Sequence, residues 1–314
     1  MRHTKTKGPS ADFFVLSRRK KTRIIYPNIM KIIDGKACAQ QIKDQITKEV
    51  EMIRAIGFRV PKLAIILVGD RPDSLSYVRS KEKTCKSLGM NCDTYLLPAT
   101  TSEREIMDLI DRLNNDRTVD AILIQLPLPE HYDSAKILDF IDYKKDADGL
   151  HLMNVGLLHL GEPYVMPCTP KGIISLLETN NIDVAGKHAV VIGRSQLVGE
   201  PTAQLLIRQN ATVTLCHSHT KNLSDITRIG DIIITAAGHP NLLKPEDFKE
   251  GAILIDVAIN RTDEGLEGDV YSPRTREALE QRLSAATPVP GGVGPMTIAM
   301  LMQNVLDMYK IKNA

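Results

Sequence analysis

The sequence predicts an α/β protein with two doubly wound parallel-sheet domains, the second Rossmann-like, and a cleft between them. Three observations lead to this prediction. The chain has 314 residues, which is enough for two domains. Short apolar runs alternate with segments of helical periodicity in two separate series. Both series contain an apolar run that ends in glycine before a helical segment, a pattern typical of buried parallel strands.

The first series alternates strand and helix and predicts a βαβαβ unit with a parallel sheet. Its apolar runs have the length of strands, and glycine or proline ends them. Ser102 and Glu105 have the spacing of a capping box, which begins a helix. The predicted elements are strands Lys62–Gly69, Cys92–Leu97 and Val119–Gln125 and helices Asp73–Leu88 and Ser102–Asn115.

The second series starts after about residue 150 and predicts another α/β unit of the nucleotide-binding type. A last helix, Met296–Tyr309, follows Pro295 and has an apolar stripe. We expect this helix to return to the first domain. The other predicted elements are helices Pro170–Asn180, Gly199–Gln209 and Asn222–Ile229 and strands His188–Gly193, Ala211–His217, Asp231–Ala236 and Ala252–Val257.

These elements divide the chain into three parts. Residues 1–31 hold nine Lys or Arg and one acid, Asp12, and we expect a disordered, non-functional extension. Its basic, acid-poor character also suits a mitochondrial transit peptide, and Met30 is an alternative start. Residues 32–150, completed by a helix over 296–312, form a catalytic domain. Residues 151–290 form a dinucleotide-binding, Rossmann-like domain.

Composition excludes several classes of function. A hydrophobic content of 43% and a charged content of 25% are those of an ordinary globular protein, and the net charge of +2 predicts no nucleic-acid partner. Apolar runs such as Leu63–Val68 are too short to span a membrane. The five cysteines, without CxxC spacing, indicate reduced thiols and a cytoplasmic location. His217 and His219 lack a third ligand nearby, so we expect no metal site.

Polar residues accompany the carboxyl ends of the first predicted strands. Tyr77 and Lys81 are four apart on the first predicted helix and share a face. The start of that helix lies at the sheet edge where doubly wound folds bind ligands. Gln125 closes the third strand before Leu-Pro-Leu-Pro and reaches the same crevice. From spacing alone, a surface lysine, a partly buried tyrosine and an amide that caps a strand are the simpler interpretation.

Two further segments have the character of ligand sites. Asp148 lies in the turn Lys145–Gly149, where a carboxylate serves the turn itself or holds a bidentate, amidine-like edge. Gly193 to Pro201 joins a strand to a helix start, where backbone N–H groups bind phosphate, although its glycines do not match GxGxxG. The next strand ends without an acid for a ribose 2′-hydroxyl, whereas Ser218 and Arg194 suit a 2′-phosphate. This pattern favours NADP over NAD.

The segment Thr287–Thr297 packs three prolines and three glycines into eleven residues. Proline fixes φ, and glycine permits positive φ and close backbone approach. The segment therefore predicts a loop of defined shape against which a flat ligand can lie. A rigid connector between domains is the alternative.

Taken together and in order, these motifs resemble the bifunctional 5,10-methylenetetrahydrofolate dehydrogenase/5,10-methenyltetrahydrofolate cyclohydrolase (FolD) family. The resemblance covers residues 32–312, about the whole chain except the extension. The matching segments are Tyr77-x-x-x-Lys81, Gln125-Leu-Pro-Leu-Pro, Lys145-Asp-Ala-Asp-Gly149, Pro167-Cys-Thr-Pro170, Gly193-Arg-Ser-x-x-Val-Gly199-x-Pro201 and Pro288-Val-Pro-Gly-Gly-Val-Gly-Pro-Met-Thr297.

The resemblance implies NADP-dependent oxidation of a folate's methylene bridge, then hydrolysis of the methenyl cation to 10-formyltetrahydrofolate. It implies that Lys81 transfers protons in the hydrolysis, that Gln125 tunes it, and that Tyr77 stacks on the folate. Asp148 would anchor the pterin. By the same resemblance, Pro290, Gly291, Gly292, Val293 and Gly294 line the folate site, and Gly193, Arg194, Ser195, Ser218 and Ile259 contact the dinucleotide.

The resemblance further implies a homodimer formed through the cofactor domain and a role in one-carbon metabolism, including purine, methionine and histidine biosynthesis. Two alternatives are an NAD-linked dehydrogenase with weak cyclohydrolase activity and an inactive dinucleotide-binding scaffold. Glu200 stands close to the expected phosphates, where the family more often has a basic or neutral residue. Ala258 and the segment His151-Leu-Met-Asn154 also depart from the commoner pattern, away from the catalytic set.

Overall fold

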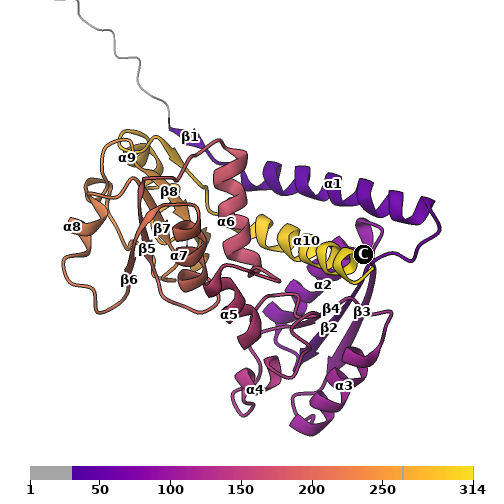
Figure 1. Cartoon of the computed structure of the whole chain (residues 1–314). Coiled ribbons are helices and arrows are strands. Elements are labelled where there is room, and N and C mark those ends of the chain that lie inside the picture. The colour runs from indigo at the N-terminus through magenta and orange to yellow at the C-terminus, as the bar shows by residue number, and fades with distance from the viewer. Residues whose placement is uncertain (1–29, 264, 314) are drawn as a thin grey trace, which may run out of the picture.

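The computed structural model describes residues 30–263 and 265–313 and contains two parallel β-sheets, one in each of two lobes (Figure 1). The sheet of the first lobe has three strands, and that of the second lobe has six. Every strand pairing within these two sheets is parallel. The predicted fold class, α/β with two parallel-sheet domains, is confirmed.

The first sheet consists of β2 (Lys62–Val68), β3 (Asn91–Leu97) and β4 (Ala121–Ile124), with β2 in the centre. Ser102 Oγ accepts a hydrogen bond from the N–H of Glu105 over 3.3 Å, and the Glu105 carboxylate accepts from the N–H of Ser102 over 2.8 Å. The predicted capping box is therefore present. The helices of this lobe are α2 (Pro72–Ser87), α3 (Glu103–Asn115) and α4 (Ser134–Leu138).

The second sheet has the strand order β1 (Lys31–Ile32), β11 (Ala285–Ala286), β8 (Ile253–Asp256), β7 (Ile232–Thr235), β5 (His188–Ile192) and β6 (Thr212–Cys216). A separate antiparallel hairpin pairs β9 (Asn260–Thr262) with β10 (Gly265–Glu267). The helices are α5 (Leu152–Leu160), α6 (Cys168–Thr179), α7 (Gly199–Arg208), α8 (Leu223–Thr227), the 3₁₀ turn η1 (Pro245–Asp247) and α9 (Arg276–Glu280). For the strands and helices of this lobe that were predicted from the sequence, the observed ends lie within two residues of the predicted ends.

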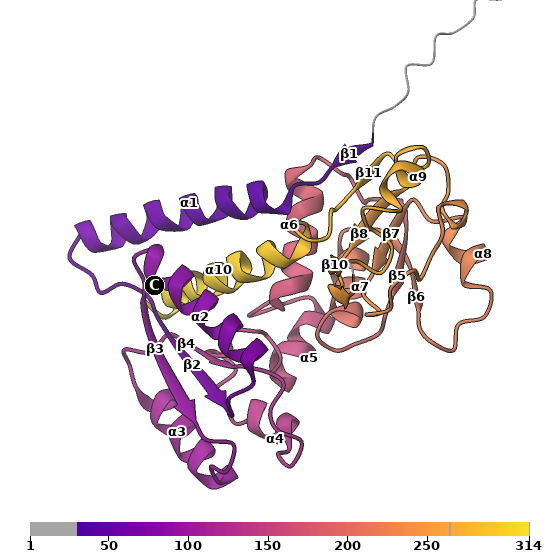
Figure 2. The same cartoon turned by 180° about the vertical axis from the view of Figure 1, so that it is seen from behind.

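Two long helices connect the lobes, and they lie side by side in both views (Figure 2). The first is α1 (Gly35–Ala55). The second, α10 (Val293–Asn313), packs against α6 and α1 and also contacts α2, β2 and β4. The expected return of the last helix to the first domain is seen in these contacts. It begins three residues before the predicted Met296, because Gly294 and Pro295 fit within its first turn.

Helix α1 (Gly35–Ala55) was not predicted. Asp34 caps it, with Oδ1 accepting from the N–H groups of Lys36 and Ala37 over 2.9 and 3.1 Å. Its buried side chains include the small Cys38 and Ala39. The apolar stripe is therefore less distinct in the sequence than a stripe of large apolar residues. Asp34, as an N-cap residue, was the feature of the sequence that could have indicated the start of this helix.

The start of the described chain belongs to the second lobe. Met30 is 2% exposed and packs in the core of that lobe, and β1 pairs with β11. The predicted disordered extension over residues 1–31 is therefore wrong for Met30 and Lys31, while residues 1–29 lie outside the described residues. A strand of two residues is too short to show periodicity in the sequence.

Two buried carboxylates hold the loops at the carboxyl edges of β7 and β8. Asp256, which is fully buried, accepts hydrogen bonds from Thr235 Oγ1 and from three backbone N–H groups at 2.7–3.0 Å. Asp269 accepts from three consecutive N–H groups of residues 237–239 and from Asn260 Nδ2. These bonds satisfy loop donors that no strand partner reaches.

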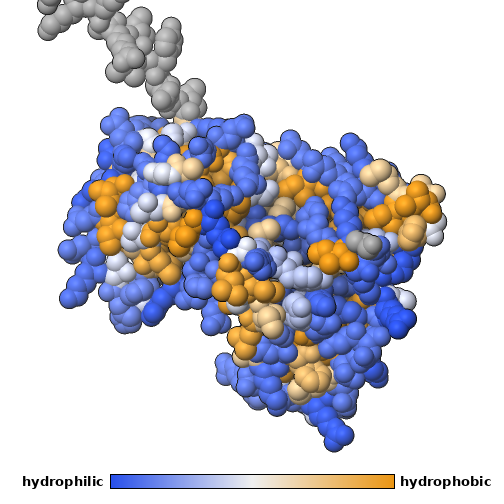
Figure 3. All heavy atoms as spheres, in the orientation of Figure 1, coloured by the Kyte–Doolittle hydropathy of each residue, from blue (hydrophilic) through white to orange (hydrophobic). Residues whose placement is uncertain are grey.

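Among the described residues, no helix combines the length and the apolar character that crossing a membrane requires. Apolar side chains are nevertheless exposed at the end of α1 that is remote from the second lobe, where Figure 3 shows an apolar patch. They belong to Met52, Ile56 and Phe58.

Replacing Asp256 tests the carboxylate network. Asp256→Ala leaves buried N–H donors without an acceptor, each at a cost of about 1–3 kcal/mol, so we expect the free energy of unfolding to fall by about 3 kcal/mol or more. Urea denaturation measures the loss. The exposed Asp263 supplies the matched control, and Asp263→Ala is expected to change stability by less than about 0.5 kcal/mol. Equal, small effects of both variants would contradict the assignment.

Candidate active site

Lys81 and Gln125 meet at the carboxyl edge of the first sheet. Lys81 Nζ donates a hydrogen bond to Gln125 Oε1 over 3.0 Å. Gln125 directly follows β4, and its backbone N–H donates to the carbonyl of Ile66 in β2 over 2.9 Å. Its Nε2 donates to the carbonyl of Leu126 over 2.6 Å. With the amide nitrogen engaged elsewhere, the buried side chain presents its oxygen to Lys81 in a fixed orientation.

Tyr77 lies one helical turn before Lys81 on α2, so the two side chains share a face of the helix. Pro72 begins this helix and Asp73 lies in its first turn, close to the sheet edge. The Tyr77 side chain is 56% exposed. An exposed ring beside an ammonium group offers a flat ligand a stacking surface next to a proton-transfer group.

Asp148 is half-buried and lies against Cys168. Cys168 Sγ donates to Asp148 Oδ1 over 3.3 Å and lies 3.5 Å from the carbonyl oxygen of Ala147. Burial, and then the negative charge of Asp148, raise the pKa of the Cys168 thiol well above its ordinary value, whereas the charge of Lys81 acts in the opposite direction. The thiol therefore stays protonated as a donor to Asp148.

The turn that carries Asp148 is anchored by its two preceding charged residues. Burial lowers the pKa of Lys145, whose Nζ nonetheless has three acceptors. The Asp146 carboxylate accepts from the N–H of Gly149 over 3.1 Å and from Asn154 Nδ2 over 2.8 Å. The acceptors of Lys145, at 2.7–2.8 Å, are the carbonyls of Leu113, Asn114 and Asp116 at the end of α3.

Asn304 of α10 joins the two loops around Asp148. Its Nδ2 donates to the carbonyls of Ala147 and Met166, each over 3.0 Å. Its Oδ1 accepts from Lys171 Nζ over 2.9 Å, and the same ammonium lies 3.0 Å from the Asp307 carboxylate. Sequence reasoning missed Asn304, although an Asn within an apolar helical stripe was a usable signal.

The proline–glycine loop packs its backbone against the start of α1. A Cβ atom on Gly35 would lie 1.7 Å from the carbonyl oxygen of Gly292, so only glycine permits this approach. The N–H of Lys36 donates to the carbonyl of Gly291 over 3.1 Å. Gly291 has φ +114°, a conformation that favours glycine. The loop is therefore fixed by α1 rather than free.

Two residues predicted to line this loop's ligand surface lie beneath it. Gly292 and Val293 are buried, the first under Thr287 and the second in the core as the first residue of α10. That the backbone of residues 290–294 lines a ligand site stays a prediction, and Gly292 and Val293 offer it little accessible surface. Pro290 is exposed and Gly291 and Gly294 are partly exposed, and these three form the accessible surface.

Gly193 and Gly199 shape the turn between β5 and α7. A Cβ on Gly193 would lie 2.3 Å from the carbonyl oxygen of Ala236, and one on Gly199 would lie 1.9 Å from that of Gly193. Gly193 has φ +118°. The spacing of six residues therefore brings two glycines into contact, and the turn leaves α7 with its N-terminus at the carboxyl edge of the sheet.

The other predicted dinucleotide contacts lie at or near this edge. Arg194 and Ser195 are exposed in the turn after β5, and Ser218 is exposed after the adjacent parallel strand β6. Ile259, 47% exposed, follows β8, and its Cδ1 would be 3.4 Å from a Cβ on Gly294. Ile259 thus connects this edge to the proline–glycine loop.

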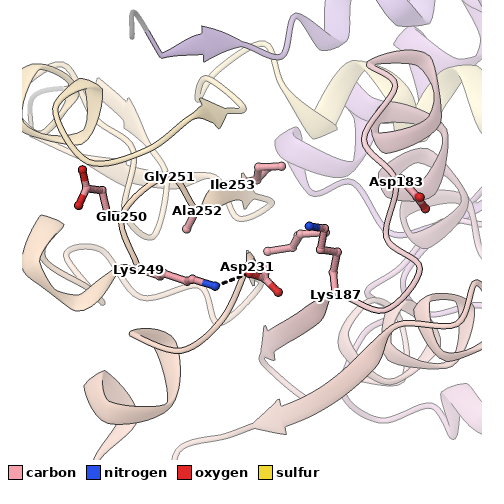
Figure 4. A pocket seen from close by; sticks show the side chains of 9 residues that line it. Asp183, Lys187, Asp231, Lys249, Glu250, Gly251, Ala252 and Ile253 are labelled. Atoms are coloured by element: carbon pink, nitrogen blue, oxygen red, sulfur yellow. Dashed lines mark hydrogen bonds and ion pairs between the residues drawn. The ribbon is translucent and has the colours of Figure 1, made fainter. Parts of the chain in front are cut away.

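A separate hollow of about 120 Å³ lies at the opposite, amino edge of the second sheet (Figure 4). The ion pair of Lys249 with Asp231, 2.6 Å, is at its wall. It contains none of the predicted site residues. Within residues 30–263 and 265–313, no group of three His, Cys, Asp or Glu side chains is placed to hold a metal ion.

Two family models match the chain. Residues 33–148 match the catalytic domain of tetrahydrofolate dehydrogenase/cyclohydrolase, and residues 167–313 match the NAD(P)-binding domain of the same enzymes. The chain is 50% identical over 281 residues to the bifunctional protein FolD of Geotalea daltonii, which covers 89% of this chain and 99% of that protein.

Solved structures agree with the family models. The Campylobacter jejuni FolD methylenetetrahydrofolate dehydrogenase/cyclohydrolase has a TM-score of 0.86 and 44% identity, over 90% of this chain and 99% of that one. The Trypanosoma brucei enzyme, solved with NADP cofactor and inhibitor, has a TM-score of 0.84 and 39% identity, over 90% of this chain and 98% of that one.

The contact between α1 and the proline–glycine loop gives a prediction. Gly35→Ala places a methyl group against the Gly292 carbonyl, so α1 or the loop must shift, and we expect a loss of stability of about 1–3 kcal/mol. Thermal unfolding measures it. A Cβ on Gly156 of α5 would meet no atom within 4 Å, and Gly156→Ala is expected to be neutral or stabilising. A Gly35→Ala variant as stable as wild type would refute the contact.

Proposed function

The chain belongs to the tetrahydrofolate dehydrogenase/cyclohydrolase family, and from this premise we propose that one crevice, between the carboxyl edges of the two sheets, serves both reactions of that family. The protein oxidises 5,10-methylenetetrahydrofolate to 5,10-methenyltetrahydrofolate with NADP and hydrolyses the product to 10-formyltetrahydrofolate. The observation that carries the proposal is the hydrogen bond between Lys81 and Gln125 at the carboxyl edge of the first sheet.

The turn at Gly193 fits a dinucleotide. Its two glycines remove side chains from the start of α7, where backbone N–H groups and the helix dipole favour a phosphate. Arg194 and Ser218 suit a 2′-phosphate, and β6 ends without an acid, which supports NADP rather than NAD. When bound, NADP supplies the acceptor for a hydride. Arg194, Ser195 and Ile259 would hold it at this edge.

Lys81 is the proposed proton-transfer residue of the hydrolysis. Its ammonium donates to the Gln125 oxygen, which fixes the direction of the remaining N–H bonds. To take a proton from water, Lys81 must first release one of its own. The bond from Gln125 Nε2 to the Leu126 carbonyl fixes the amide group. Its oxygen then orients Lys81 toward the proposed crevice without adding a negative charge.

Asp148, Tyr77 and the proline–glycine loop are the proposed folate contacts. The Asp148 carboxylate can accept two parallel N–H bonds from a pterin edge, and the Cys168 thiol limits its rotation. The Tyr77 ring offers a stacking face one turn away. Pro290, Gly291 and Gly294 offer backbone surface without bulky side chains. Such positioning holds the bridge carbon in reach of both steps.

The division into domains remains a proposal. Residues 32–150 with 296–312 would form the folate-binding part and 151–290 the NADP-binding part, with β1 contributed to the second sheet. A homodimer through the cofactor domain is supported by β6, which ends the second sheet and bears the exposed Leu215. Light scattering tests it. A cytoplasmic location and the supply of purine, methionine and histidine biosynthesis rest on the resemblance to bacterial enzymes.

A spectrophotometric assay tests the overall function. Purified protein with methylenetetrahydrofolate and NADP is expected to form a methenyl-folate absorbance, and NAD at the same concentration to support a slower rate. An absence of cofactor-dependent methenyl formation would reject the dehydrogenase. A faster rate with NAD would favour an NAD-linked enzyme instead.

Lys81→Met tests the proton-transfer role separately. Because general acid–base catalysis contributes about 10²–10⁴-fold, hydrolysis of added methenyl-folate is expected to fall by at least about 10²-fold while the circular dichroism spectrum stays unchanged. Lys83, an exposed neighbour on the same helix, provides the control Lys83→Met, expected to hydrolyse at the wild-type rate. Full hydrolysis by Lys81→Met would remove Lys81 from the mechanism.

A further inference from the structure

Two cysteines outside the proposed active site face each other between α2 and β3. Cys85 lies in the last turn of α2, one turn beyond Lys81, and Cys92 is the second residue of β3. Cys85 is fully buried, whereas Cys92 is partly exposed and packs against the core that contains Cys85. Neither residue has a part in the proposed reactions.

The antiparallel course of α2 and β3 brings the two thiols together. The chain reverses at Gly89, so a step forward along α2 corresponds to a step back along β3. Thr94 Oγ1 donates to the Glu82 carboxylate over 3.3 Å. Cys85 lies three residues after Glu82 in α2. Cys92 lies two residues before Thr94, on the same face of β3. The same register therefore places Cys85 opposite Cys92.

Direct contacts of Cys85 agree with this register. Cys85 Sγ lies 3.4 Å from the carbonyl oxygen of Asn91, the residue before Cys92. The carbonyl of Cys85 accepts from the N–H of Met90 over 3.3 Å, which holds the end of the helix against the start of the strand. Cys92 directly follows Asn91 and packs against the core that contains Cys85.

The two thiols differ in acidity. The contact with Cys92, and then burial, raise the pKa of Cys85. The neighbouring Cys85 thiol lowers the pKa of Cys92, against the opposing effect of burial. The partly exposed member is thus the one that reaches the thiolate, which is the form that reacts with oxidants. The buried member remains a thiol beside it.

We propose that Cys85 and Cys92 are a reversible redox site, which a peroxide oxidises to a disulfide that ties α2 to β3. The Cys92 thiolate attacks one oxygen of hydrogen peroxide, and the O–O bond breaks to give a sulfenic acid and hydroxide. Cys85 sulfur then displaces the hydroxyl group from Cys92 sulfur as its proton leaves, forming the S–S bond and water. Two thiols lose two electrons, and one peroxide becomes two waters.

The disulfide affects the active site through α2. An S–S bond of about 2.05 Å requires the two sulfurs to approach more closely than non-bonded thiols do. The last turn of α2 must move toward β3, and Lys81 lies one turn before it. Because a displacement of 1 Å can cost about 10²-fold in rate, we expect oxidation to slow methenyl-folate hydrolysis by about tenfold or more. This rate effect rests on the proposed role of Lys81, whereas the disulfide does not.

Peptide mapping tests the bond itself. Trypsin cleaves at Lys86, between the two cysteines, so the full-length protein treated with hydrogen peroxide is expected to yield residues 84–86 joined to residues 87–104. The joined peptide should be two hydrogens lighter than the sum of its parts and disappear on reduction with dithiothreitol. Free thiols in the denatured protein should fall from five to three. No joined peptide, or one that links other cysteines, overturns the proposal.

Variants separate the bond from general oxidation. Cys92→Ser is expected to keep the basal hydrolysis rate and to lose the peroxide effect, and Cys38→Ala, which leaves the pair intact, to respond like wild type. Should wild type form the disulfide yet hydrolyse at an unchanged rate, the regulatory half is overturned. If Lys81→Met shows no hydrolytic defect but the joined peptide forms, the redox site stands and the proposed function fails.

Discussion

The approach of Gly35 to the carbonyl of Gly292 is the constraint on which the arrangement of the molecule depends. It joins the start of α1 to the loop that begins α10, and both helices then run together into the first lobe. A side chain at Gly35 would separate the two helices at their common origin. The same contact fixes the accessible face of the proline–glycine loop, which is a wall of the proposed crevice.

From this origin, α10 reaches the loops on both sides of Asp148. Asn304 lies about three turns along the helix and binds the backbone on both sides of the Asp148–Cys168 contact. Lys171 Nζ donates to the Asn304 oxygen and also to the Asp307 carboxylate, so both ends of the amide are held. A buried polar network of this kind stabilises one arrangement only when every member is satisfied. The position of Asp148 is therefore decided by a helix from the far end of the chain.

The sequence predicted the alternating strands and helices of the two sheets, and it missed β1 and α1. Apolar runs and helical spacing were sufficient for β2, β5 and the helices between strands, because local periodicity reflects burial. Strand β1 has two residues and no periodicity, and α1 fills its stripe partly with Cys38 and Ala39. Tyr77 and Lys81 were singled out by their spacing on the first predicted helix, and Gln125 by its place at a strand end. The partners of Asn304, Ala147 and Met166, lie more than 130 residues away, and the approach of Cys85 to Cys92 depends on how α2 packs on β3; single-sequence patterns encode neither.

The location of the thiol pair has a physical rationale. An oxidisable group within the crevice would compete with the folate for space and would alter the charge around Lys81. At the opposite end of α2, Cys85 and Cys92 act on the same rigid helix without touching the substrate. Helix α2 is connected to the rest of the first lobe chiefly through β2 and β3, with few contacts to α10. A bond at one end therefore meets little opposition from the long helices, and its displacement is transmitted along α2 to Lys81.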